Sequence, residues 1–241
     1  MRVTIHQPEH LPWLGLLHKM QDVDVFVVLD NVQYRRRYFQ NRNKLRSGPG
    51  EGGVQWITVP VQGGKRDETL IKNVRIDTTG KAWQRKNLAS VRKCYGKAPY
   101  FDAYFPGFEA IYSRETSWLC ELNTDLLYWL MQGFGIDVPF VWASELPVRG
   151  TASDLILSIC EATGATSYFS GISGNDYLTM TSFAQSGVEV DFQEFHHPIY
   201  KQLHQPFIPC ITSLELLFLY GPGARAILNG EGVEQMDTLF L

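Results

Sequence analysis

Cysteines are few in this chain, and long apolar runs are absent. The four cysteines form no C-x-x-C pair and have no histidine at zinc-finger spacing: Cys94, Cys120, Cys160 and Cys210. No stretch approaches the roughly 18 apolar residues that cross a bilayer, and His6, Gln7 and Pro8 interrupt the first apolar run. We therefore expect a cytoplasmic protein with free thiols, no signal peptide and no membrane partner.

Strong net charge is missing as well. The 22 Lys and Arg residues and 25 Asp and Glu residues give a formal net charge of −3, which excludes a generally basic nucleic-acid binder. The positive charge is nevertheless concentrated in one place. Residues 34–46 read YRRRYFQNRNKLR, with six basic residues, no acidic residue and two adjacent aromatic residues, Tyr38 and Phe39. Such a local patch attracts phosphates even on an acidic protein.

Strand-like and helix-like segments alternate along most of the 241 residues. We predict strands over 2–8, 24–30, 56–61, 71–76, 138–144, 166–171 and 188–195. We predict helices over 13–23, 81–96, 117–135, 151–164, 179–187 and 212–221, and a short helix or loop over 97–113, which Pro99 and Pro106 interrupt. This order predicts one α/β domain, 1–241, with a doubly wound, mostly parallel sheet. The irregular basic loop and the helices at about 80–135 are expected to form a lid or subdomain over the carboxyl edge of the strands.

Ligands of open α/β sheets bind beyond the carboxyl ends of the strands. The segment HQPEHLPWLG follows the first predicted strand, and DNVQYRRRYFQNRNK follows the second. If these two strands are neighbours, their polar side chains converge on one cleft with the arginines: His6, Gln7, His10, Asp30 and Gln33. The basic stretch would then hold an anion.

The residue types of the basic stretch suit a phosphorylated ligand. Arg binds phosphate or carboxylate with two parallel hydrogen bonds, whereas Lys acts as a point charge. Nearby amides suit a sugar or nucleotide: Gln40, Asn41 and Asn43. A plain solvated loop explains the charge equally well. A nucleic-acid strand is a weaker alternative, because no RNA-binding signature accompanies the patch.

His6 and His10 are candidates for acid–base chemistry, since imidazole titrates near neutral pH. Their H-x-x-x-H spacing resembles a helical metal motif, but Pro8 lies inside it and no Glu follows His6 directly. We therefore expect no metal and no other cofactor. The loop also resembles the two-histidine motif of nucleotidyl transferases in its place in the fold, although its spacing differs.

A second candidate lies in YFSGISGNDY, residues 168–177, where small residues end a predicted strand. Their backbone amides could approach an anion, and Ser170 and Asn175 offer polar side chains. A simple turn is an equally good reading, because the segment has neither a G-x-S-x-G nor a Walker pattern. His196 and His197, beside a proline, are more typical of surface or packing residues.

Seven blocks taken together resemble the WbqC-like family of bacterial proteins. In order they are IHQPEHLPWLGLLHKM, DVFVVLDNVQY, RRYFQNRNK, WITVPV, YGKAPYF, YFSGISGNDYL and HHPIYKQ. The family's motif positions fall on His6, Gln7, Pro8, Trp13, Gly15, Asp30, Gln33, Arg37, Asn41, Arg42 and Asn43. Two departures stand out: Asn87 where the family has His, and Glu215 where Asp is usual.

The resemblance implies a role in O-antigen or other surface polysaccharide biosynthesis, or in natural-product clusters. It suggests acyl or aminoacyl transfer onto a nucleotide-activated or amino sugar, from an acyl donor, a carrier protein or an aminoacyl-tRNA. In this hypothesis Arg37 and Arg42 hold the phosphate or carboxylate, His6 relays a proton, and Asp30 orients it. Two alternatives stay open: a non-catalytic protein that binds a partner or carrier, and a nucleotidyl-transferring or adenylating enzyme. The oligomeric state is left open.

Overall fold

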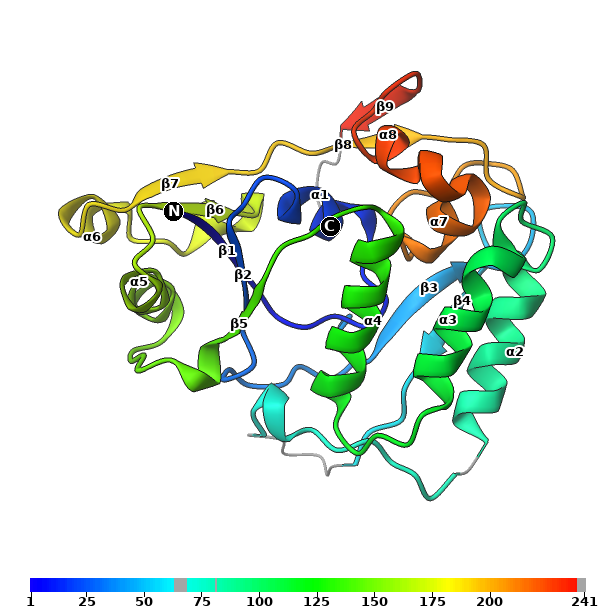
Figure 1. The fold of residues 1–241 in the computed structure, drawn as a ribbon, viewed down its shortest axis with the longest axis horizontal. Helices are drawn as coiled ribbons and strands as arrows, with labels where there is room; N and C mark the ends of the chain where they lie inside the picture. Colours follow the sequence, from blue (N-terminus) through cyan, green and yellow to red (C-terminus); the bar gives the residue numbers. More distant parts are fainter. Residues whose placement is uncertain (63–68, 81, 238–241) are drawn as a thin grey trace.

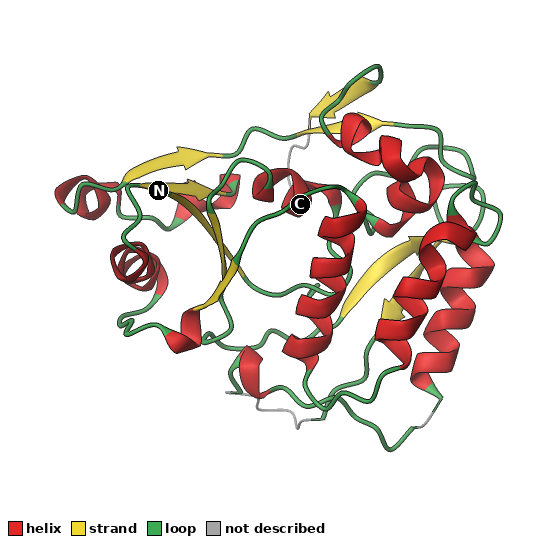
Figure 2. Ribbon diagram, viewed as in Figure 1, coloured by secondary structure: helices red, strands yellow, loops and turns green. Residues whose placement is uncertain are grey.

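A five-stranded parallel sheet forms one side of the molecule, and a group of helices forms the other (Figures 1 and 2). The computed structural model describes residues 1–62, 69–80 and 82–237. The strand order is β5 (Phe140–Trp142), β2 (Val25–Val28), β1 (Arg2–His6), β6 (Ser167–Ser170) and β7 (Glu189–Phe192). Every neighbouring pair in this sheet is parallel, which confirms the expected α/β class.

Helices cover both faces of the sheet because successive strand residues point to opposite sides. The helices next to the sheet are α1 (Leu14–Met20), α5 (Ala152–Thr163) and α6 (Met180–Gln185). Val3, Ile5 and Val27 belong to one apolar core, together with residues of α5 and α6. Phe26 and Val28 belong to a second core, together with residues of α1 and the helical side. The sheet is therefore doubly wound, as the sequence predicts.

The strand order places a topological switch point at β1. From β1 the chain proceeds outward to β2 and β5 on one side, and β6 and β7 lie on the other side. Ligands of doubly wound sheets bind at the carboxyl ends of the strands where the order reverses. His6 ends β1 and Ser170 ends the adjacent strand β6, so both residues lie at this edge.

The helical side consists of α2 (Trp83–Tyr95), α3 (Phe101–Ser113), α4 (Leu119–Gly133), α7 (Leu214–Tyr220) and α8 (Ala224–Leu228). The segment 97–113, predicted as a short helix or a loop, contains a helix that is longer than expected, because α3 runs for 13 residues from Phe101 through Pro106. Phe101, Phe105 and Phe108 form a buried stripe at helical spacing. Burial of each ring stabilises the fold by roughly 1.5–3 kcal/mol. The three rings together outweigh the cost of about 3 kcal/mol for Pro106 inside the helix.

Two antiparallel strand pairs were not predicted. One is a hairpin that pairs β3 (Arg42–Arg46) with β4 (Val54–Thr58). The other is not a hairpin but a two-stranded antiparallel sheet of β8 (His196–Ile199) and β9 (Glu234–Asp237), with α7 and α8 between the two strands in the sequence. The basic stretch is thus only partly irregular. In β3, Asn43 and Leu45 are buried while Arg42 and Lys44 are partly exposed, so the alternation typical of a strand is present but is masked by charge.

The strand predicted over 71–76 was wrong. Residues Ile71–Asn73 form the 3-10 helix η1, and only isolated bridges follow it, at Arg75 and Ile76. Three further 3-10 helices are η2 (Ala143–Glu145), η3 (Ile172–Asp176) and η4 (Gly221–Gly223). The buried side chains Ile71, Val74 and Ile76 pack into the helical core, and this packing does not require a ladder of strand hydrogen bonds.

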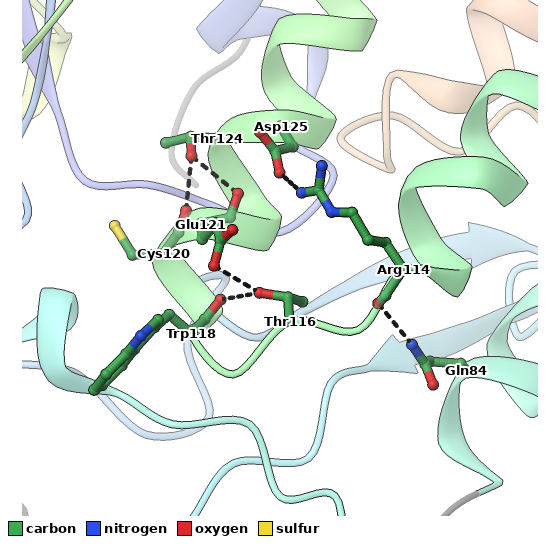
Figure 3. A network of polar contacts seen from close by, with 8 residues as sticks. All are labelled: Gln84, Arg114, Thr116, Trp118, Cys120, Glu121, Thr124 and Asp125. Atoms are coloured by element: carbon green, nitrogen blue, oxygen red, sulfur yellow. Dashed lines mark hydrogen bonds and ion pairs between the residues drawn. The ribbon is translucent and has the colours of Figure 1, made fainter.

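Polar contacts fix the start of α4 against its neighbours (Figure 3). The Thr116 hydroxyl donates to Oε2 of Glu121 at 2.9 Å, and Arg114 forms an ion pair with Asp125. The Gln84 amide, on α2, donates to the carbonyl oxygen of Arg114 at 3.2 Å. The ion pair is exposed and contributes little stability by itself. These contacts hold α4 and α2 in one arrangement, and both helices carry residues of the buried network described below.

Two charged side chains lie in the interior of the helical side. The Arg46 guanidinium donates to the carbonyl oxygens of Gly50 and Pro206 at 2.9 and 2.8 Å. Glu215, on α7, accepts hydrogen bonds from Tyr200 Oη at 3.1 Å and Gln202 Nε2 at 2.8 Å. Burial raises the pKa of Glu215 to about 7, although these hydrogen bonds and the charge of Arg46 oppose the shift.

Glu215→Gln is expected to change the pH dependence of stability. A carboxyl whose folded pKa of about 7 lies above its ordinary value of 4.5 stabilises the fold fully below 4.5 and loses that contribution as the pH rises through 7. The free energy of unfolding of the variant, relative to the native protein, should therefore rise by about 2–3 kcal/mol between pH 5 and pH 8. Denaturant titrations at both pH values measure it. The exposed control Glu231→Gln should show no such change, and parallel curves for Glu215→Gln would contradict the assignment.

Candidate functional site

Three ionisable side chains meet at the carboxyl end of β1. His6 Nε2 lies 3.3 Å from Oε1 of Glu9, and His6 Nδ1 lies 3.3 Å from Nζ of Lys19. The His6 side chain is 31% exposed, whereas Glu9 and Lys19 are buried. We call these residues the Glu9–His6–Lys19 cluster. His6 is the member of the cluster that is reached from the surface.

Local chain geometry assembles this cluster. The strand β1 ends at His6, and Pro8 follows in the loop. The side chain of Glu9, three residues after His6, turns back to contact the imidazole. Lys19 comes from the last turn of α1, where all but one of the seven residues are buried. A lysine in this position is unusual, because Lys is almost never fully buried unless it is paired. The helix α1 is part of the connection between β1 and β2, and the Lys19 amine extends from it to His6.

The surroundings of the cluster lower the pKa values of His6 and Lys19. Burial lowers the pKa of His6, the positive charge of Lys19 lowers it further, and Glu9 opposes both effects. Burial lowers the pKa of Lys19 to about 8, again with Glu9 opposing. When Lys19 carries its proton, the ammonium donates to Nδ1 of a neutral His6, and the Nε2 proton then faces the Glu9 carboxylate. Lys19 and Glu9 thus contact opposite nitrogens of the His6 ring.

Asp30 lies in a different environment from the one expected. Its carboxylate is buried and accepts hydrogen bonds from the Ser144 backbone N–H at 2.9 Å and the Ser144 hydroxyl at 2.7 Å. It therefore ties the end of β2 to the segment after β5. The hydrogen-bond partner that orients His6 is Glu9, a residue that the sequence reasoning did not select.

His10 belongs to a buried network. Its Nδ1 lies 3.1 Å from Oδ1 of Asn123, and its Nε2 lies 3.1 Å from the hydroxyl of Tyr112. Asn123 Nδ2 donates to the carbonyl oxygens of Pro8 and Gln40, so its Oδ1 must accept, and His10 carries its proton on Nδ1. Burial lowers the pKa of His10 to about 4. This histidine is therefore neutral at pH 7, and its side chain is enclosed in the interior.

Asn87 extends the same network on α2. Its Nδ2 donates to the hydroxyl of Tyr112 at 2.8 Å and to the carbonyl oxygen of Thr58 at 2.9 Å. Burial raises the pKa of Tyr112 strongly, so its hydroxyl stays protonated and can donate to His10. Asn87, which stands where a histidine is expected, therefore links α2, α3 and β4.

Amide side chains join the two loops that follow β1 and β2. Gln7 Oε1 accepts from Nε2 of Gln40 at 2.6 Å, and the backbone N–H of His10 donates to the carbonyl oxygen of Phe39 at 2.8 Å. Asn43 is buried, and its Nδ2 donates to the carbonyl oxygen of Leu11 at 2.7 Å. The two loops thus lie side by side, because β1 and β2 are neighbours.

The other predicted residues differ in exposure. Asn41 is buried and donates to the carbonyl oxygen of Val59 at 2.9 Å, whereas Gln33 and Arg37 are exposed. Arg42 is partly exposed and donates to the carbonyl oxygen of Arg37. Ser170 is buried, with its hydroxyl directed to the carbonyl oxygen of Gly171 at 3.0 Å; Asn175 is exposed on η3. The structure thus joins the first two loops through amides and leaves Asn175 on a separate segment.

Two surface hollows lie away from these residues. One is lined by Tyr128 and residues 137–140, and the other by residues of α6 and β7. Neither hollow contains a predicted site residue.

Within the described ranges no group of three His, Cys, Asp or Glu side chains is arranged to hold a metal ion. Burial raises the pKa of the Cys94 thiol to about 11 despite the nearby charge of Lys93, so this cysteine is a poor nucleophile.

The sequence did not point to three residues: Glu9 and Lys19 of the cluster, and Trp56, an exposed ring that lies against the Arg42 side chain. The available signals were the spacing of three between His6 and Glu9, and a single Lys within the apolar helix segment LGLLHKM. No signal in the sequence indicated that Trp56 stays on the surface, since most tryptophans are largely buried.

The fold and this edge define a doubly wound α/β protein with an ionisable cluster at its topological switch point. A family model described as the WbqC-like protein family matches residues 7–227, and the chain belongs to that family. The chain is 29% identical over 230 residues to a protein of Mycobacterium tuberculosis (strain ATCC 25618 / H37Rv) described as uncharacterized protein Rv1507c; the match covers 95% of this chain and 97% of that protein. No solved structure matches the chain.

His10→Ala is expected to destabilise the protein by about 2–4 kcal/mol. The substitution leaves the buried Oδ1 of Asn123 without its donor and the hydroxyl proton of Tyr112 without its acceptor, and it opens a cavity. Denaturant unfolding at pH 7.5 measures the loss. The exposed control His196→Ala should change stability by less than about 0.5 kcal/mol. Equal effects of the two substitutions would show that the His10 network does not hold the fold together.

Proposed function

We propose that this protein is a transferase that moves an acyl or aminoacyl group onto the amine of a nucleotide-activated or other amino sugar, in the biosynthesis of bacterial surface polysaccharide or a related product. The observation that carries the proposal is the Glu9–His6–Lys19 cluster, which presents a partly exposed imidazole at the switch point of the sheet. Family membership supports the biosynthetic context, since the chain matches the WbqC-like model over residues 7–227.

The chemistry of acyl transfer needs what this cluster offers. As the sugar amine attacks the carbonyl carbon, a carbon–nitrogen bond forms, the bond to the leaving group breaks, and one proton passes from the amine to the leaving group. His6 takes this proton, and Glu9 stabilises the imidazolium that forms. Lys19 opposes the imidazolium, so the ring passes the proton on readily. The Nδ1 to Nζ separation of 3.3 Å is long for a hydrogen bond, which lets a substrate amine compete for Nδ1.

The buried position of His10 weighs against nucleotidyl transfer or adenylation. That chemistry would need the second histidine of the first loop to reach a triphosphate, whereas both ring nitrogens of His10 are engaged in the interior. A protein that only binds a partner or carrier would need the basic stretch but not the ionisable cluster. The proposed substrates are a sugar nucleotide and an acyl donor, which is a small molecule, a carrier protein or an aminoacyl-tRNA. Across the described residues no helix is both long and apolar enough to cross a membrane.

His6→Ala is expected to lower turnover by about 10²- to 10⁴-fold while the fold stays intact, because the proton relay is lost. The assay incubates the purified protein with amino-sugar nucleotides and a panel of acyl-CoA, acyl phosphate and aminoacyl-tRNA donors, and mass spectrometry detects the amide product. His196→Ala, an exposed histidine on β8, is the matched control and should keep full turnover. A folded and fully active His6→Ala protein would remove His6 from the mechanism. Binding without turnover in the native protein would favour the carrier-binding alternative.

Lys19→Met tests the electrostatic role of the buried amine. The charge of Lys19 lowers the pKa of His6, so removal of this charge should raise that pKa. As the pH falls, His6 of the variant should then become protonated at a higher pH than in the native protein. We therefore expect the acid limb of the kcat/KM profile to move to higher pH, with substrate KM nearly unchanged at the optimum. An unshifted acid limb in a folded variant would mean that Lys19 only fills space.

A further inference from the structure

The outer face of the β3–β4 hairpin and the adjoining loop, residues 35–39, together form a surface that carries aromatic rings beside basic side chains. In the antiparallel register Lys44 lies opposite Trp56, and Arg42 lies opposite Thr58, so these four side chains share one face. The other face is buried through Asn43, Leu45 and Ile57. The core contacts of the hairpin therefore come from the inner face, and they leave the composition of the outer face free to serve another purpose.

Three basic side chains lie over aromatic rings on this surface. The Arg42 guanidinium carbon is 4.2 Å and Lys44 Nζ is 5.5 Å from the ring centroid of Trp56. The Arg35 guanidinium carbon is 4.8 Å from the ring centroid of Tyr38. Phe39 lies between the two rings, with its centroid 5.5 Å from Tyr38 and 6.1 Å from Trp56. Tyr38 is 40% exposed and Trp56 is 45% exposed, so both rings keep open area.

Among the described residues, these three positive charges of the surface have no counterion. Over the described part of the sequence, the ion pairs involve none of Arg35, Arg42 and Lys44. The Arg42 guanidinium donates to the carbonyl oxygen of Arg37, and its buried Nε atom has no hydrogen-bond partner among the described residues. Cations held this way bind an anion with little rearrangement, and an arginine fork matches the oxygens of a phosphate. Exposed aromatic rings provide a stacking surface for a base.

We propose that this surface binds the nucleoside diphosphate part of the substrate, with the base stacked on the exposed part of Trp56 and the phosphates held by Arg35, Arg42 and Lys44. The inference rests on the proposed function, since it identifies the activating group of the amino sugar. A connection to the reacting end exists through amides. The Arg35 backbone N–H donates to Oε1 of Gln40 at 2.7 Å, and Nε2 of Gln40 donates to Gln7, the residue after His6.

Calorimetric titration of the native chain tests the site without any turnover. The probes are the diphosphates of uridine, thymidine, guanosine, cytidine and adenosine, inorganic pyrophosphate, and a single-stranded RNA ending in CCA. We expect at least one nucleoside diphosphate to bind tenfold or more tightly than pyrophosphate, because only the former can stack. Trp56→Ala should remove that advantage and leave the affinity for pyrophosphate unchanged. Arg42→Gln should weaken both ligands tenfold or more.

Arg75→Gln is the matched control, because Arg75 also lies over a tryptophan, Trp118, with 4.4 Å between the guanidinium carbon and the ring centroid, but neither residue belongs to this hairpin. It should leave nucleotide binding unchanged. His6→Ala should bind nucleotide normally, so loss of turnover and loss of this site are separate results. The proposal is overturned if no nucleoside diphosphate binds at millimolar concentration, if only the RNA binds, or if Trp56→Ala keeps the preference for nucleoside diphosphate over pyrophosphate.

Discussion

The hydrogen-bonded imidazole of His10 joins the two sides of this molecule. It lies in the loop after β1 and contacts Asn123 of α4 and Tyr112 of α3, and Tyr112 in turn contacts Asn87 of α2. A buried polar chain of this kind is stable only when every group has its partner, because an unpaired member costs about 1–3 kcal/mol. The network therefore fixes one position for the loop that carries His6 and Glu9, and one position for the helices beside it.

Two histidines four residues apart have different properties because their surroundings differ. His10 is enclosed between neutral hydrogen-bonding partners, and its pKa falls to about 4. His6 is partly exposed and lies between a carboxylate and an amine, which act on its pKa in opposite directions. His10 thus serves as a structural hydrogen-bonding residue, whereas His6 is an accessible ionisable group. This difference is expected because the environment of a side chain sets its pKa.

The hairpin β3–β4 gives the basic stretch a defined surface. Strand pairing places alternate residues on opposite faces, so Asn43 and Leu45 hold the hairpin to the core while Arg42 and Lys44 face outward beside Trp56. A flexible loop would present the same charges in many arrangements and would lose entropy on binding. A hairpin anchored through its inner face presents them in one arrangement, together with a ring on which a base can stack.

The sequence by itself determined the alternation of strands and helices, the parallel sheet, the family, and the meeting of two polar loops at one edge. These features follow from local periodicity and from the rule that parallel strands end at a common edge. The tertiary structure alone decided the partners of each side chain: Lys19 beside His6, Asn123 beside His10 across 113 residues of chain, and Ser144 beside Asp30. It also decided that α3 continues through Pro106 and that Trp56 stays outside. Such contacts depend on how distant segments pack together, and residue periodicity carries no information about them.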